Sequence, residues 1–177
     1  EYASLYFYRL RRDDCEQTGL AACYSLDEYE KGLIKKHERT RPDKEDDRTR
    51  HILAVRAQTG IVFLVYRELD SITEVKERTC CRSPLIDVTA PDGVQHTLWK
   101  LEPNDQRIII KAFSRVTSLY VADGHHRIAS AARARAQLMR TQGSDTVAEA
   151  NHVLAVAFPD SETRILPYNR AVTDLGG

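Results

Sequence analysis

The sequence predicts an α/β (α+β) fold in which helices flank a mixed β-sheet. Apolar runs typical of strands alternate with segments of helical periodicity, and this alternation favours helices packed on a sheet. Hairpin signals interrupt the alternation, so the sheet should contain antiparallel as well as parallel pairs. The chain has 177 residues, of which 42% are hydrophobic and 29% charged. We therefore expect one domain over residues 1–177, as a fragment of a longer chain.

Two strands and a helix are expected at the N-terminus. Residues 2–10 and 18–24 are rich in β-formers or small apolar residues, and a polar turn joins them. Ser25 and Glu28 match the capping box S-x-x-E. A helix should therefore begin after Ser25 and extend over residues 26–36.

A charged block, residues 37–50, follows this helix. It predicts a solvated connector and the start of a second helix over about residues 43–58, because Pro42 suits a first helical turn. Gly60 is placed to end that helix. The continuous apolar run 61–68 predicts a buried strand.

The middle of the chain, about residues 69–117, is less regular. Residues 71–78 fit a short helix or a strand, and both alternatives stay open. Residues 84–101 resemble a hairpin whose turn is Pro91-Asp92-Gly93. A helix over 103–115 should follow.

The last third predicts a strand over 118–122 and an alanine-rich helix over about 127–141. The polar residues 142–150 should form a loop, and 152–159 a buried strand. Residues 164–172 are expected to add a strand and an edge segment, with Tyr168-Asn169-Arg170 as candidates to border a pocket.

Composition excludes some classes of protein. The 26 basic and 26 acidic residues cancel, which argues against a dominant nucleic-acid surface. No apolar run approaches the length of a membrane span, so no membrane association is expected. The four cysteines form no C-x-x-C pair, so a zinc knuckle is not expected. Reduced thiols and a cytoplasmic location are the default expectation.

The stretch VADGHHRIAS (residues 121–130) carries the clearest chemical signal. Gly124 permits a sharp turn between strand and helix, and the free amides of a helix N-terminus attract anions. Arg127 adds a forked cation, and His125 and His126 add donors that titrate near neutral pH. Asp123 suits a metal-bound water or a substrate hydroxyl. The unit therefore predicts a phosphate or nucleotide site.

Plainer alternatives exist. Asp123 is equally suited to cap the helix, with both histidines on the surface. Zinc is disfavoured because sequential residues in a turn rarely aim at one point and no H-x-x-x-H pair is present. His37 and Glu38 do not form the zinc-protease motif either, because position 41 is Arg.

The motifs resemble those of the ParB/sulfiredoxin-like superfamily. ADGHHRIASA follows an apolar strand, and His37-Glu38 precedes a helix, Gly60 and a strand. The closer resemblance is to uncharacterised conserved proteins often labelled SpoOJ/ParA/ParB/RepB family. It rests on the blocks QTGL (17–20), KHERTRPDKEDDR (36–48), TGIVFLVYR (59–67), LYVADGHHR (119–127) and ILPYNR (165–170).

This resemblance implies a ParB/sulfiredoxin-like core with an insertion at about 69–117. It also implies a likeness to free-serine kinases, in which Glu38 would be the base on a substrate hydroxyl. Asp123 would hold Mg²⁺, and His126 would join Glu38 and Asp123 in catalysis. Phosphates of ATP, ADP or CTP would be bound by His37, Arg39, Gly124, His125, His126 and Arg127, with Arg41 and Arg48 as further candidates.

The expected function is thus a nucleotide-dependent phosphotransferase acting on a small hydroxyl-bearing molecule. It requires Glu38 and Arg127 to face each other across one cleft. The alternative is a nucleotide-binding, ParB-like switch whose partner is a protein or, less favoured, DNA. Sulfiredoxin-like thiol repair ranks last, because His125 occupies the position where that chemistry needs a cysteine.

Overall fold

The computed structural model describes residues 4–142, 148–164, 169 and 171–172. Eight strands form one mixed sheet in the order β3-β7-β4-β8-β2-β1-β6-β5. The strands are β1 Tyr6–Arg12, β2 Cys15–Ser25, β3 Ile34–Lys35, β4 Val62–Tyr66, β5 Ile86–Thr89, β6 Gln95–Lys100, β7 Leu119–Asp123 and β8 His152–Pro159. The helices are α1 Leu26–Glu30, α2 Pro42–Val55, α3 Asp70–Cys80, α4 Pro103–Phe113 and α5 His125–Gln142.

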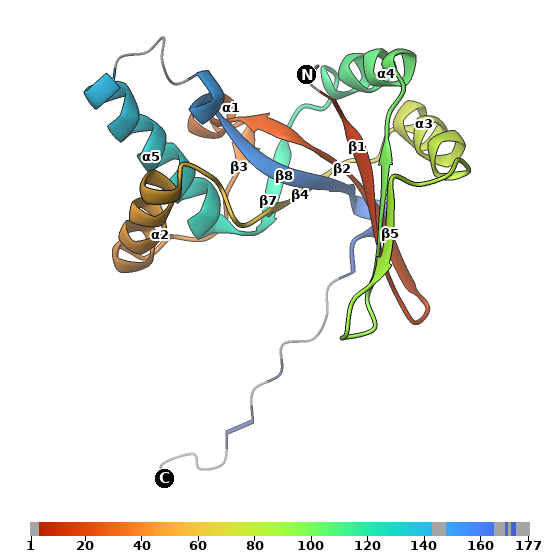
Figure 1. Ribbon diagram of the computed structural model, residues 1–177, viewed down its shortest axis with the longest axis horizontal. Coiled ribbons are helices and arrows are strands. Elements are labelled where there is room, and N and C mark those ends of the chain that lie inside the picture. The colour runs from red at the N-terminus through yellow and green to blue at the C-terminus, as the bar shows by residue number, and fades with distance from the viewer. Residues whose placement is uncertain (1–3, 143–147, 165–168, 170, 173–177) are drawn as a thin grey trace.

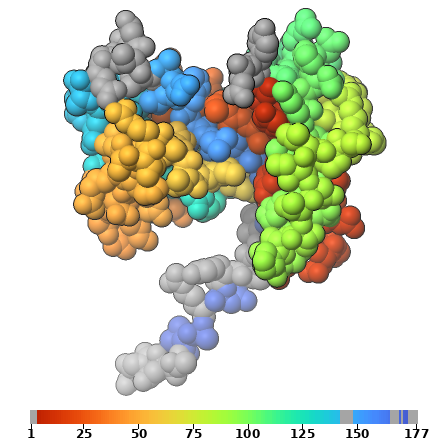
Figure 2. All heavy atoms as spheres, viewed as in Figure 1, coloured from red at the N-terminus to blue at the C-terminus, as the bar shows by residue number. Residues whose placement is uncertain are grey.

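The longer helices form two pairs at opposite ends of the sheet. Helices α2 and α5 pack against each other beside β7 and β4, and α3 packs against α4 near β1 and β6 (Figure 1). The space-filling view shows these pairs as two masses with the surface hollowed between them (Figure 2). The predicted mixed sheet with flanking helices is confirmed.

The core lies where the central strands meet α5. Leu64 of β4 and Val121 of β7 are completely buried, and β8 is buried over most of its length. Ile128, Ala131 and Ala134 form the buried face of α5, since residues three or four positions apart share one side of a helix. Burying this apolar surface stabilises the end of the sheet from which β7 leads into α5.

Helix α1 is shorter than predicted, and the strand after it was missed. Ser25 caps it as expected, because its hydroxyl accepts hydrogen bonds from the amides of Asp27 and Glu28. The predicted helix over 26–36 is wrong beyond Glu30. Gly32 has a φ of +75°, a left-handed conformation that ends the helix, and β3 begins at Ile34.

Two other helix boundaries differ from the expected ones. Helix α2 ends at Val55, since Arg56 adopts the left-handed conformation (φ 55°), so Gly60 does not end it. Helix α5 begins at His125, two residues earlier than predicted, which places both histidines and Arg127 in its first turn. This boundary matters for function because the first turn carries the unpaired amides.

Residues 69–117 extend the sheet and add the second helix pair. Residues 71–78, left open between helix and strand, lie in α3. The predicted hairpin is confirmed as β5 and β6, with Gly93 at a φ of +82° in its turn. Strand β6 pairs with β1, so this segment lies at the far end of the sheet from β7.

Two of the expected segments fall partly outside the residues that the structure describes. Of the loop 142–150, residues 143–147 lie outside the described residues, and a short 3₁₀ helix covers Ala148–Asn151. Most of the strand expected over 164–172, with Tyr168 and Arg170, also lies outside them. Among the helices of the described residues, none combines the length and apolar character that crossing a bilayer requires.

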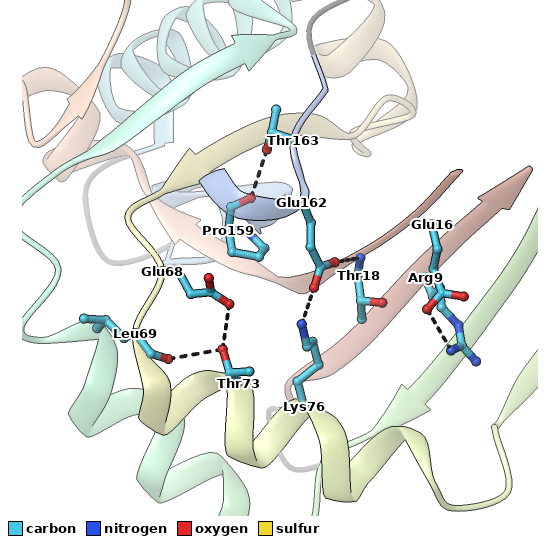
Figure 3. Close-up of polar contacts among 10 residues, drawn as sticks. All are labelled: Arg9, Glu16, Thr18, Glu68, Leu69, Thr73, Lys76, Pro159, Glu162 and Thr163. Carbon is cyan, nitrogen blue, oxygen red and sulfur yellow. Dashed lines mark hydrogen bonds and ion pairs between the residues drawn. The ribbon is translucent and has the colours of Figure 1, made fainter. Parts of the chain in front are cut away.

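Glu162 connects three parts of the fold. It ends the short 3₁₀ helix Asp160–Glu162 after β8, and its carboxylate accepts a hydrogen bond from the Thr18 amide of β2 at 2.6 Å. The same carboxylate forms an ion pair with Lys76 of α3 (Figure 3). These contacts attach α3 to the sheet.

Candidate functional site

Strand pairing brings two distant loops together at one edge of the sheet. Strand β3 runs parallel to β7, with Ile34 opposite Leu119 and Lys35 opposite Tyr120. The carboxyl ends of parallel neighbours lie side by side. The loop after β3, which carries His37 and Glu38, therefore lies beside the turn that joins β7 to α5.

Gly124 shapes that turn. Its φ of +93° is in a region that side-chain-bearing residues rarely adopt, and an added Cβ would lie 3.4 Å from the Val62 Cα. The amides of Arg127 and Ile128 donate to the Gly124 carbonyl at 2.8 and 3.0 Å. The helix thus starts directly after Gly124, where its amides and dipole favour an anion.

His125 is the buried residue of the site. It is 4% exposed, and its Nδ1 lies 3.4 Å from Glu38 Oε2. Its ring meets the His37 ring edge-on, with 4.4 Å between centroids. Burial, with a smaller contribution from His37, lowers the pKa of His125, while the Glu38 carboxylate opposes this shift. These influences favour the neutral imidazole.

His126 and Arg39 are less buried than His125. The Nε2 of His126 accepts a hydrogen bond from the Arg41 amide at 3.1 Å, which connects the first turn of α5 to the residue before α2. His126 thus helps to hold the loop that carries Glu38. Arg39 is exposed in that loop.

Arg127 points to the other side of β7. Its Nη1 donates to the Ile61 carbonyl at 2.7 Å and lies 3.4 Å from Asp123 Oδ2. Strand β4 runs antiparallel to β7, so the residues before β4 reach the same sheet edge. Gly60 permits this arrangement, because an added Cβ would lie only 2.9 Å from Arg127 Nε. Asp123, the expected magnesium ligand, is therefore ion-paired with Arg127.

A cavity of about 380 Å³ opens beside Arg127. Arg48 and His51 of α2 line it together with Arg127, so three groups that can carry positive charge border one space. The other lining residues are Asp47, Ile52, Gln58, Thr59, Gly60 and Val153. The sequence indicated Arg48 and Arg127 but no role for His51, Gln58 or Thr59.

The expected arrangement, in which Glu38 and Arg127 face each other across one cleft, takes a different form. Both lie at the same sheet edge but on opposite sides of β7. Strand β3 leads to Glu38 on one side, and Ile61, which Arg127 contacts, precedes β4 on the other. Glu38 meets His125, and Arg127 meets Ile61. The first turn of α5 connects the two halves, because it carries both His125 and Arg127.

One constellation was missed from the sequence. His37, Glu38 and His125 each offer a ligand atom, and these three atoms lie within 4.8 Å of one another. The argument against zinc treated the pair His125-His126 and the pair His37-Glu38 separately, and did not combine residues from both. The rings of His125 and His126 do diverge, since His126 turns to the Arg41 amide.

The comparisons with known proteins identify a family without an assigned activity. The family whose model matches is described as a protein of unknown function (DUF1015), and the match covers residues 1–177. No curated protein and no solved structure matches the chain. This match corrects the expected family. Membership of the ParB/sulfiredoxin-like superfamily or the SpoOJ/ParA/ParB/RepB family, and with it the likeness to free-serine kinases, is not supported.

Proposed function

Because the chain belongs to the DUF1015 family of unknown function, we propose a function from the site alone: nucleotide-dependent phosphoryl transfer to the hydroxyl group of a small molecule. One observation carries the proposal. The Glu38 carboxylate lies against the first turn of α5, and Arg127 in that same turn borders a cavity with Arg48. A proton acceptor and a phosphate-binding region thus flank one helix N-terminus, on either side of β7.

The phosphate side of the site is the α5 N-terminus with the adjoining cavity. Unpaired amides and the helix dipole favour an anion there, and guanidinium groups bind phosphate oxygens in pairs. Arg127 is 43% exposed although it contacts Ile61, so it can also contact a ligand. Together with Arg48 and His51 it suits the phosphates of ATP, ADP or CTP.

The acceptor side is the Glu38 carboxylate, whose side chain is 58% exposed. Glu38 orients the acceptor hydroxyl and takes its proton as the hydroxyl oxygen bonds to the terminal phosphorus. The bond from that phosphorus to its bridging oxygen breaks, and the shortened nucleotide leaves. Charge on the transferred group is stabilised by Arg127 and the helix amides.

Two further residues have supporting roles in this proposal. His126 positions the loop through the Arg41 amide. Asp123, at the end of β7 and 76% exposed, is a candidate to contact the Mg²⁺ that accompanies nucleotide phosphates, in exchange for its ion pair with Arg127.

The test uses ³¹P NMR with ATP, ADP and CTP against a panel of hydroxyl-bearing amino acids and hydroxy acids. Glu38→Gln should abolish transfer and leave nucleotide affinity nearly unchanged, whereas Arg127→Ala should weaken nucleotide binding. Arg67→Ala is the matched control, because Arg67 is exposed and pairs with Asp160 away from the site. A chain that binds none of these nucleotides in calorimetry would contradict the proposal. Nucleotide binding without transfer to any acceptor would contradict its catalytic step.

A further inference from the structure

We propose that His37, Glu38 and His125 form a binding site for one transition-metal ion of the zinc class. Two imidazoles and one carboxylate come from the loop after β3 and the first turn of α5, which lie far apart in the sequence but meet at the carboxyl ends of β3 and β7. The metal site stands on this geometry, whether or not phosphoryl transfer takes place.

The distances suit a shared ion. The three ligand atoms lie within 4.8 Å of one another, and His125 Nδ1 is 3.4 Å from Glu38 Oε2. Two ligand atoms that each lie about 2.0–2.1 Å from a tetrahedral zinc ion are roughly 3.4 Å apart. A charge-assisted hydrogen bond between the same atoms would measure about 2.7–2.9 Å. The separation of this one pair therefore matches a shared ion, while the wider limit of 4.8 Å for the trio requires the exposed His37 or Glu38 side chain to move closer as an ion binds.

His125 is the buried, fixed ligand of the trio. Its side chain is 4% exposed, and its Nε2 is buried without a hydrogen-bond partner among the described residues. A buried polar atom normally has a partner, since leaving it unpaired costs free energy. An ion held between Nδ1 and the Glu38 carboxylate does not pair with Nε2, so the unpaired Nε2 marks His125 as a buried ring short of partners, and the trio's geometry alone places the ion.

The exposure of His37 and Glu38 predicts an open coordination position. His125 is fixed in the first turn of α5, while His37 and Glu38 are exposed and can adjust around an ion. Three protein ligands with a fourth position open to solvent are typical of catalytic zinc sites. Imidazole ligands also discriminate against Mg²⁺ and Ca²⁺, which prefer oxygen ligands.

An ion at this position would change how Glu38 acts. A metal with an open position binds a water or a substrate hydroxyl and lowers its pKa, so Glu38 would act on the hydroxyl through the metal instead of as a free base. This consequence rests on the proposed function, whereas the site itself does not.

The experiment uses the chelator-treated full chain. Co²⁺ is titrated while the visible absorption that marks tetrahedral coordination is recorded, and Zn²⁺ is measured by equilibrium dialysis. One ion per chain is expected. His37→Ala and Glu38→Gln change exposed residues, so the fold should be retained, and each should weaken metal binding about tenfold or more. His152→Ala is the matched control, because His152 is an exposed histidine at the start of β8.

Several results would overturn the metal site: no stoichiometric binding of Zn²⁺ or Co²⁺, affinity unchanged in both trio variants, or an equal loss in His152→Ala. Nucleotide binding is measured in parallel with Mg²⁺. A chain that binds zinc through the trio but binds no nucleotide supports the metal site and contradicts the phosphotransferase. A chain that transfers phosphoryl groups but binds no transition metal supports the phosphotransferase and contradicts the metal site.

Discussion

Gly60 leaves the space in which the Arg127 side chain lies. A Cβ at position 60 would come within 2.9 Å of Nε and 3.0 Å of Cδ of Arg127, closer than atoms normally approach. The contact involves a flexible side chain, so the backbone need not move. The expected consequence is a displaced guanidinium group in an otherwise intact fold.

Gly60→Ala should therefore weaken nucleotide binding while leaving the fold stable. A charge-assisted hydrogen bond is worth about 1.5–3 kcal/mol, so the affinity should fall about tenfold or more. The free energy of unfolding should change by no more than about 1 kcal/mol. Calorimetry and urea unfolding measure the two quantities.

The double variant Gly60→Ala with Arg127→Ala serves as the control. It should bind nucleotide no more weakly than Arg127→Ala alone, because both changes act through the same side chain. Additive losses would show that Gly60 acts on binding by another route.

Among the elements, α1 depends most clearly on its neighbour. A five-residue helix is too short to be stable alone. Arg135 of α5, whose side chain is 6% exposed, forms ion pairs with Asp27 at 2.6 Å and Glu30 at 2.8 Å. Arg135 thus attaches α1 to α5, just before the chain enters β3 and the loop with Glu38.

The contact predicts a pH dependence. The hydrogen bond from Arg135, together with its positive charge, lowers the pKa of Asp27 below its ordinary value of 3.8. The charged carboxylate therefore stabilises the fold above about pH 4, and this stabilisation is lost as the pH falls through the lower folded-state pKa. Asp27→Asn should be less stable than the natural chain at pH 7, and the difference should shrink in acid.

Thermal unfolding from pH 7 to pH 3 measures this difference. Asp13→Asn is the matched control, because Asp13 is 87% exposed and asparagine tolerates its positive φ. A gap between Asp27→Asn and the natural chain that stays constant down to pH 3 would argue against the pairing.

On the scale of the whole molecule, the two helix pairs share one sheet, and Glu162 helps to hold the pair that lies away from the site. Its carboxylate accepts the hydrogen bond of the buried Thr18 amide and pairs with Lys76 of α3 (Figure 3). Loss of that acceptor would leave a buried amide without a partner.

Glu162→Ala should destabilise the fold by about 1–3 kcal/mol, the usual cost of an unpaired buried donor. Glu162→Gln should cost less, since its amide oxygen can still accept from Thr18 although the charge that pairs with Lys76 is gone. Urea unfolding of both variants measures which of them loses more free energy of unfolding. Equal stability of the two would show that only the ion pair matters. Metal and nucleotide binding should stay unchanged, because Glu162 follows the carboxyl end of β8, whereas Arg127 meets Ile61 at the amino end of the parallel neighbour β4.

Elements with strong local signals were predicted well. The apolar run of β8, the hairpin around Gly93 and the cap at Ser25 all agree with the structure. The failures have local causes of their own. Arg56 ends α2 in a conformation usually taken by glycine, and β3 is a two-residue strand within a segment that resembled the end of a helix.

By itself the sequence determined that a glycine turn joins a strand to a helix, with Asp123, His125, His126 and Arg127 gathered around it, because strand periodicity, turn residues and helix signals are local properties. Only the tertiary structure decided which distant groups these residues meet. The parallel pairing of β3 with β7 brings His37 and Glu38 to His125, and the antiparallel pairing of β4 with β7 turns Arg127 toward Ile61. Strand order follows from the packing of the whole core, which no short stretch of residues encodes.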